Sequence, residues 1–92
     1  MTDGAFFQGQ GIGTTPQFNL VGGQYAVDVN SSGAGTATVV KVLSDGTTVA
    51  VSAALAGTSP GSHTLLTLGP GLYQVTVAAA TCDVAISRVH QF

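Results

Sequence analysis

Short runs in which apolar and polar residues alternate recur along the chain. The run 73–77 reads Tyr-Gln-Val-Thr-Val, so its apolar residues fall on one side and its polar residues on the other. This period of two is typical of a strand that is buried on one face only. Pro70 and Gly71 precede the run, and they suit the two central positions of a type II turn. The pattern therefore predicts a strand over 63–68, a tight turn and a strand over 73–79.

The same alternation predicts further strands, separated by turns that are rich in glycine and serine. Lys41 breaks the phase of the run 36–43, so we expect a β-bulge near Val40 that turns the lysine outward and Val42 inward. Residues 53–56 fit either a helical turn or an irregular bridge, and no internal repeat is evident. The predicted inward residues are Tyr25, Val27, Val29, Ala37, Val39, Val42, Val49, Val51, Leu66, Leu68, Tyr73, Val75, Val77, Val84 and Ile86.

About seven short strands, with no convincing helix, predict an all-β protein. The favoured architecture is a small antiparallel β-sandwich, Ig-like or jelly-roll-like, and a small barrel is the less favoured alternative. We assign the sandwich to residues 17–92. Residues 1–16 are glycine-rich and show no sustained periodicity, so we expect a flexible N-terminal arm there.

The arm contains three large apolar residues, Phe6, Phe7 and Ile12. Such side chains on a mobile segment are costly to expose to water unless they dock on another surface. Two interpretations stay open. In the first, the arm packs on its own domain. In the second, it lies across a neighbouring subunit or a host surface, and these three residues bind that partner.

Charged residues are scarce. They make up 7% of the 92 residues, whereas about 25% is typical of soluble domains. The cations are Lys41 and Arg88, the acids are four aspartates, and the net charge is −2. Two separated cations form no basic stripe, which argues against binding nucleic acid or an anionic membrane surface. A surface of hydroxyls and amides is desolvated at low cost, so we expect an assembly to cover much of it. The plainer interpretation is a soluble polar β domain.

Cys82 is the only cysteine, so no disulfide can form within the chain. At an apolar strand position it is interpreted as a small buried hydrophobe. The first residues form no signal peptide, and no segment reaches the roughly 20 apolar residues of a membrane span. We therefore expect a chain that is made and folded in a reducing cytoplasm.

No arrangement of residues predicts catalysis. His63 and His90 have no carboxylate or cysteine at metal-ligand spacing. The aspartates are dispersed and glutamate is absent, so no acid–base pair is indicated. The glycine-rich run 9–13 follows no predicted strand, opens no helix and lacks lysine, unlike a phosphate loop. We predict no enzyme activity, no cofactor and no metal site.

Several motifs follow one another in a distinctive order. They are Phe18-x-Leu20-x-Gly22-Gly23-x-Tyr25-x-Val27-Asp28-Val29, Ala37-x-Val39-x-x-Val42, Asp45-Gly46-Thr47, Leu68-x-Pro70-Gly71-x-Tyr73-x-Val75 and a strand of small residues over 81–89. In this order they resemble small β-sandwich proteins encoded among the structural genes of tailed bacteriophages. The resemblance covers residues 18–89. It implies a virion component without catalytic residues, either a capsid decoration (cement) protein or a head-fibre or tail-fibre module.

The leading hypothesis is a non-enzymatic capsid decoration protein that is made in the bacterial host cytoplasm and lies on the capsid surface of the virion. Its partner would be the major capsid protein, and the resemblance also implies a homotrimer. The alternative hypothesis is a receptor- or glycan-binding module of a phage fibre or bacterial adhesin. In that case, the strand-end loops 31–35 and 57–62 would contact the ligand.

Overall fold

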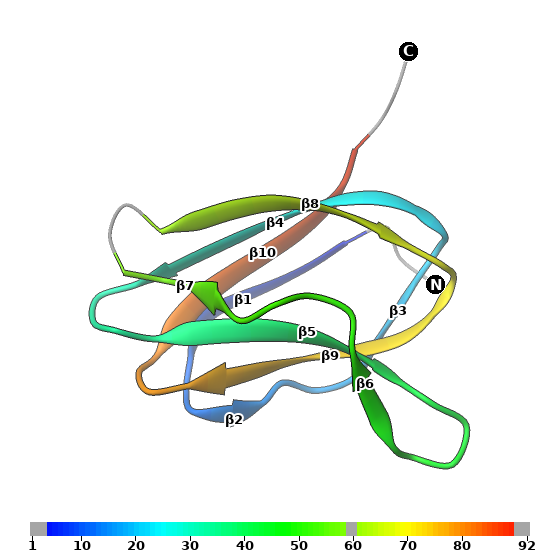
Figure 1. The fold of residues 1–92 in the computed structure, drawn as a ribbon, viewed down its shortest axis with the longest axis horizontal. Coiled ribbons are helices and arrows are strands. Elements are labelled where there is room, and N and C mark those ends of the chain that lie inside the picture. Colours follow the sequence, from blue (N-terminus) through cyan, green and yellow to red (C-terminus); the bar gives the residue numbers. More distant parts are fainter. Residues whose placement is uncertain (1–3, 59–60, 90–92) are drawn as a thin grey trace.

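The computed structural model describes residues 4–58 and 61–89. Within these ranges the chain forms strands joined by turns, and it contains no helix (Figure 1). The strands are β1 (Gly4–Gln10), β2 (Gly13–Thr14), β3 (Phe18–Leu20), β4 (Gly23–Ser31), β5 (Thr36–Val42), β6 (Thr48–Ala50), β7 (Leu55–Ala56), β8 (Ser62–Leu68), β9 (Gly71–Ala78) and β10 (Cys82–Arg88).

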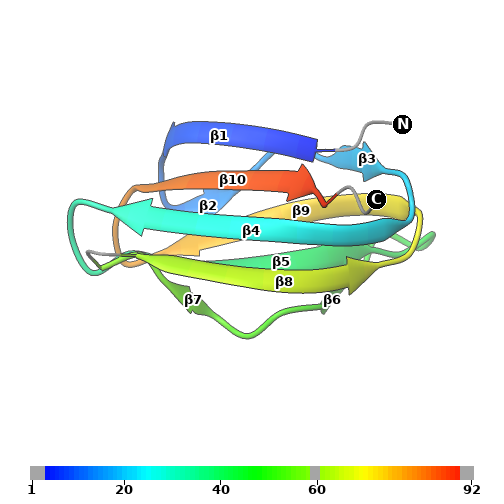
Figure 2. The same ribbon diagram turned by 90° about the horizontal axis from the view of Figure 1, so that it is seen from above.

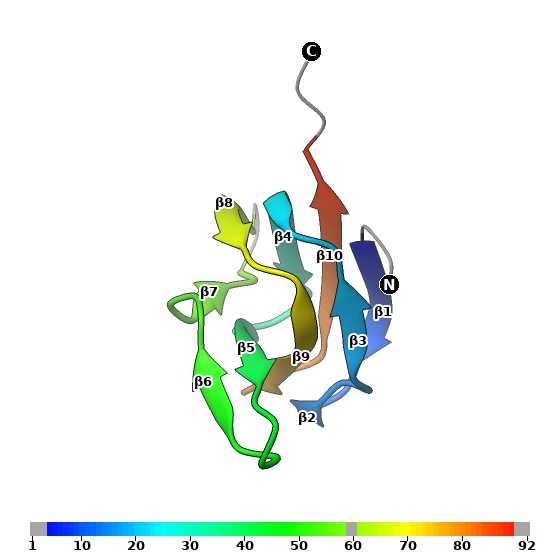
Figure 3. The same cartoon turned by 90° about the vertical axis from the view of Figure 1, so that its right-hand side faces the viewer.

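The strands form two antiparallel sheets that pack face to face. The four-stranded sheet has the order β1-β10-β4-β8. The six-stranded sheet has the order β2-β9-β5-β6, with β3 also paired to β9 and β7 also paired to β5. Figure 3 shows both layers from one end of the molecule. The prediction of an all-β antiparallel sandwich is therefore confirmed. Three further elements, β1, β2 and β7, add to the strands that the alternation predicts.

The core lies between the sheets and consists mainly of residues that the alternation places inward. Cys82 is also buried there, as a free thiol. Val49 is an exception with 50% exposure, because β6 belongs to a hairpin that projects away from the opposite sheet (Figure 1). The buried residues that were predicted are Tyr25, Val27, Val29, Ala37, Val39, Leu68, Tyr73, Val75, Val77, Val84 and Ile86.

The N-terminal segment is part of the sandwich, so the expectation of a flexible arm is corrected for residues 4–14. β1 pairs with β10 in the four-stranded sheet, and β2 pairs with β9 in the six-stranded sheet. A β-bulge between Phe7 and Gln10 hides the alternation in the sequence, and Gly9 within it has a φ of 63°. The interpretation in which this segment packs on its own domain is therefore the correct one, and no domain boundary falls at residue 16.

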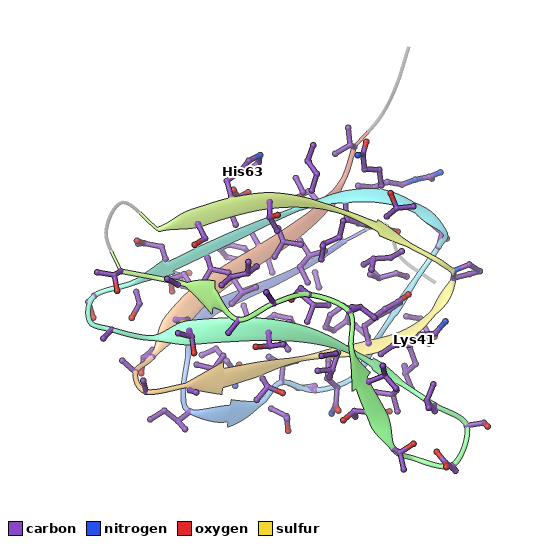
Figure 4. All side chains as sticks on the ribbon, viewed as in Figure 1. Lys41 and His63 are labelled. Atoms are coloured by element: carbon purple, nitrogen blue, oxygen red, sulfur yellow. The ribbon has the colours of Figure 1, made fainter. Side chains whose placement is uncertain are left out.

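The β-bulge predicted near Val40 is also wrong, because β5 pairs with β9 in one continuous register from Thr36 to Val42. Lys41 keeps the inward phase and lies opposite Tyr73, near one end of the sandwich (Figure 4). Its Nζ atom is 6.0 Å from the centre of the Tyr73 ring. The aliphatic stem of a lysine can cover a ring while its charge stays near solvent, so the strand needs no bulge.

Residues 53–56 form a bridge, not a helical turn, since β7 pairs with the first residues of β5. The turn at Asp45-Gly46 is as predicted, and Gly46 has a φ of 88°. Gly71 has a φ of 158°, whereas a type II turn needs about +80°. The chain therefore bends at Pro70 and crosses from one sheet to the other without a type II turn.

An internal twofold repeat relates the two sheets, with β3-β4-β5 corresponding to β8-β9-β10. β3 pairs with β9, so that Leu20 lies opposite Gly71. In the same way β8 pairs with β4, so that Leu68 lies opposite Gly23. The two halves share only the pattern Leu-x-x-Gly-x-Tyr-x-Val-x-Val. This repeat was missed in the sequence because the remaining positions differ and only strand pairing aligns the halves.

The two cations occupy equivalent places in this repeat. Arg88 lies opposite Tyr25, as Lys41 lies opposite Tyr73. A Cβ on Gly23 would lie 2.8 Å from Nε of Arg88, and a Cβ on Gly71 would lie 3.1 Å from Cε of the lysine. Both glycines therefore leave room for a long cationic side chain.

Gly35 is buried in the turn before β5. A Cβ there would lie 2.6 Å from Sγ of Cys82 and 2.7 Å from the carbonyl oxygen of Ala80. We expect Gly35→Ala to lower the free energy of unfolding by about 1–3 kcal/mol, because those atoms must shift to admit the methyl group. Urea denaturation measures the change. The matched control is Gly33→Ala in the same loop, whose Cβ would lie 3.5 Å from the Ala80 Cβ. An equal loss in both variants would contradict the steric explanation.

Candidate interaction surface

One row of side chains crosses the outer face of the four-stranded sheet. Phe6 of β1 lies opposite Ala85 of β10. Ala85 lies opposite Asp28 of β4, which lies opposite His63 of β8. We call these four residues the Phe6 row. Figure 4 shows His63 pointing away from the sandwich on the outer side of β8. The row therefore combines an aromatic ring, a small residue and two polar side chains on one exposed face.

A shallow hollow of about 270 Å³ lies along the Phe6 row. Ala85 is small, so it leaves open space between Phe6 on one side and the polar pair Asp28 and His63 on the other. Asn30, Asp83 and Ser62 also line this hollow. The hollow is thus bounded by one aromatic wall and several hydrogen-bonding groups.

The polar groups of the hollow are held by contacts between strands. Asp28 accepts a hydrogen bond from Nδ1 of His63, and both side chains are more than half exposed. Asp83 Oδ1 accepts the backbone N–H of Gly9 at 2.6 Å, which fixes the bulge in β1. The exposed contact between Asp28 and His63 contributes little to stability. Its effect here is to orient an acceptor and a ring nitrogen beside the aromatic wall.

The Ser62 hydroxyl and the Cys82 thiol both contact backbone carbonyl groups. The Ser62 hydroxyl donates to the carbonyl of Ala56, so it is not directed at the ring of His63. Cys82 is buried and its thiol faces the carbonyl oxygen of Ala80 at 3.6 Å. Over residues 4–58 and 61–89, no group of three or more His, Cys or Asp side chains could hold a metal ion.

The structure separates the three residues predicted to bind a partner. Phe6 is 66% exposed on the outer face of β1, and Ile12 is 69% exposed in the turn between β1 and β2. Phe7 points the other way and packs against the core, with its ring centre 5.6 Å from that of Phe18. Phe7 is therefore a structural residue, and only the other two are available to a partner.

The hairpin between β5 and β6 presents further exposed apolar side chains. Leu43 is 40% exposed and Val49 is 50% exposed. The turn is held by Asp45, whose Oδ1 accepts the Thr47 hydroxyl at 2.6 Å and the Thr47 N–H at 3.0 Å. These hydrogen bonds, the hydroxyl contact first, lower the pKa of Asp45 below its ordinary value of 3.8. The hairpin is thus a preformed projection with an apolar surface.

Sequence reasoning missed the pairing of Asp28 with His63. The two residues are 35 positions apart, and neither has a partner at a recognisable local spacing. Their outward phases in β4 and β8 were visible, but their contact depends on the register between those strands. His90, the other histidine considered, lies outside the described residues.

Comparisons with known proteins identify no relative: no family model matches the chain, and no curated protein or solved structure matches it. In the part of the chain that the structure describes, no helix is long and apolar enough to cross a membrane.

The different surroundings of the adjacent phenylalanines give a direct test. We expect Phe7→Ala to lower the free energy of unfolding by about 2 kcal/mol or more, because the ring leaves a cavity against the core. Phe6→Ala serves as the control and should change it by less than about 0.5 kcal/mol in dilute solution. Chemical denaturation of both variants measures these values. If Phe6→Ala were the more destabilising change, the assigned orientation of β1 would be wrong.

Proposed function

We propose that the protein is a non-enzymatic structural protein of a bacteriophage virion, which decorates the head shell by binding the major capsid protein. The motif order over 18–89 supports a virion protein through its resemblance to small phage β-sandwich proteins. The observation that carries the mode of binding is the hairpin between β5 and β6. It projects from the sandwich, and residues 43–50 are exposed along its whole length (Figure 1).

This hairpin is suited to inserting into a groove of a partner protein. Its shape is fixed before binding by the Leu43 N–H to Thr47 carbonyl hydrogen bond and by the contacts of Asp45. A preformed element loses little conformational entropy when it binds. Leu43 and Val49 would supply the apolar area, as their exposed side chains are the large hydrophobic ones of the hairpin.

The scarcity of charge supports attachment to a large protein surface. Charged residues make up 7% of the chain, so most of its polar surface consists of hydroxyls, amides and backbone. Such groups can exchange hydrogen bonds with water for hydrogen bonds with a partner without the penalty of burying a charge. The proposal includes the homotrimer that the resemblance implies, with the virion as its location.

The hairpin model predicts that Leu43→Asp combined with Val49→Asp weakens attachment to purified shells at least about tenfold, equivalent to about 1.4 kcal/mol. The reason is that a carboxylate must be desolvated where an apolar contact is lost. Cosedimentation of the protein with shells measures occupancy. Ser32→Asp, in an exposed loop, is the matched control for added charge. Undiminished occupancy of the double variant would refute attachment through the hairpin.

A glycan-binding module is the second candidate function, and the hollow along the Phe6 row favours it. An exposed aromatic ring beside carboxylate and amide acceptors suits the apolar faces and hydroxyls of a sugar. The loops first considered for this role are less suitable. Ser31 donates its N–H to the Gly57 carbonyl at 2.7 Å, and Gly57 donates to Gly35 at 2.7 Å, so the described parts of these loops bond to each other.

The glycan hypothesis predicts that sugars binding to the isolated protein shift the resonances of Phe6 and Asn30, and that Phe6→Ala abolishes the shifts. Glycan-array screening followed by NMR titration measures this. Ile12→Ala is the control, because Ile12 is equally exposed but lies outside the residues that line the hollow. Sugar binding that survives Phe6→Ala would place the site elsewhere.

A further inference from the structure

Both edges of the six-stranded sheet are interrupted at the same level along the strands, beside the cross-strand pair Val39 and Val75. At one edge, between β2 and β3, the Thr15 hydroxyl accepts the N–H of Val75 at 3.0 Å. At the other edge, between β6 and β7, the Ser52 hydroxyl accepts the N–H of Val39 at 3.0 Å. Val39 and Val75 are cross-strand partners. The edge strands here contain only two or three residues each. Short, broken edges of this kind resist pairing with another chain.

The four-stranded sheet has edges of the opposite kind. Its edge strands β1 and β8 each contain seven residues (Figure 2). Neither contains proline, lysine, arginine, aspartate or glutamate. The β-bulge of β1 lies beyond Phe7, so the part before it is regular. Long edge strands without charge or proline are the form that readily accepts a further strand.

Each of these edges also exposes one large apolar side chain. Leu65 of β8 is 52% exposed, and Phe6 of β1 is 66% exposed. Leu65 pairs with Ala26 and Phe6 pairs with Ala85, which places both on the outer face of the sheet. An extended strand added to one edge would therefore meet an apolar side chain on that face.

We propose that β8 of one copy pairs with β1 of a second copy, which continues the four-stranded sheet from chain to chain. Successive strands in this sheet are antiparallel, so β1 and β8 run in opposite directions. Copies related by rotation about an axis along the strands therefore meet as an antiparallel pair. With Leu65 opposite Phe6 of the other copy, Leu66 falls opposite Ala5, and Thr64 falls opposite Phe7 at the start of the bulge.

The observations favour a second copy over an unrelated partner because the two edges complement each other. The proposed register sets Leu65 against Phe6 and Leu66 against Ala5, and it opposes no like charges. Pairing β8 with its own copy would leave the exposed Phe6 edge unused. The β8–β1 contact is head to tail, so it closes into a ring when the rotation allows. This contact would explain how copies of the chain associate in the proposed homotrimer. Only the number of copies, three, rests on the proposed function.

The experiment is a charge exchange read by light scattering on the full chain. We expect the wild-type chain to be oligomeric. Leu65→Lys and Phe6→Glu should each reduce the mass to that of one chain, because a lone charge opposes an apolar residue at the contact. The double variant Leu65→Lys with Phe6→Glu should recover the oligomer, since the two charges then meet between copies. Val49→Lys is the control for a charge at an exposed apolar site outside both edges, and it should leave the mass unchanged.

A wild-type chain that is monomeric at every concentration overturns the proposal, as does a double variant that remains monomeric while its circular dichroism is native. Loss of mass with Leu65→Lys but not with Phe6→Glu overturns it in favour of β8 pairing with itself. As an independent check, Leu65→Cys with Phe6→Cys should give interchain disulfides, since Cys82 is buried. Shell binding is scored separately. An oligomer that fails to bind shells counts against the proposed function alone, and a monomer that binds them counts against this contact alone.

Discussion

The structure depends on two buried tyrosines that fix the places where the chain passes between the sheets. Tyr25 and Tyr73 are the largest fully buried side chains. Each hydroxyl donates to the carbonyl four residues earlier, Tyr25 to Val21 and Tyr73 to Gly69. Both carbonyl groups lie in the segments where the chain passes from one sheet to the other. Each hydrogen bond therefore gives a partner to a buried hydroxyl and to a backbone carbonyl group of the connecting segment. Burial raises the pKa of Tyr73, which keeps its hydroxyl protonated and able to donate.

The two crossings also contact each other. The position of a Cβ on Gly22 would be 3.1 Å from Cδ of Pro70, so a larger residue would force the crossings apart. Strands of the first half, β3-β4-β5, pair with strands of the second half, β8-β9-β10, so each sheet contains strands from both halves of the repeat. The chain thus obtains a closed core from a short sequence, because each half completes the sheet of the other.

The scarcity of charged residues also affects the edges of the two sheets. A chain with few charges has few lysines to protect its sheet edges. The six-stranded sheet instead has short edge strands, and the hydroxyls of Thr15 and Ser52 bond the inner strands in the gaps between them. The four-stranded sheet has no such protection at β1 and β8, and its outer face carries the Phe6 row. The contrast between the sheets is what suggests that one of them faces other molecules. The hairpin between β5 and β6 also exposes apolar side chains, and it could contact a partner other than the one at the four-stranded sheet.

The alternation of residues was enough to determine the sandwich and most of its core, because burial on one face of a strand leaves a period of two in the sequence. It could not place residues 4–14, since the bulge at Gly9 breaks that period and the strand is specified by its partner β10. Nor could it assign opposite roles to Phe6 and Phe7, which differ only in the face of the sheet that they occupy. Lys41 was misplaced because charge alone suggested an outward position, whereas its long stem packs over Tyr73. The Asp28–His63 pair, the twofold repeat and the contrast between protected and open edges were decided only by the tertiary structure. Each of them depends on which strands are neighbours and in what register, and those relations join residues far apart in the chain.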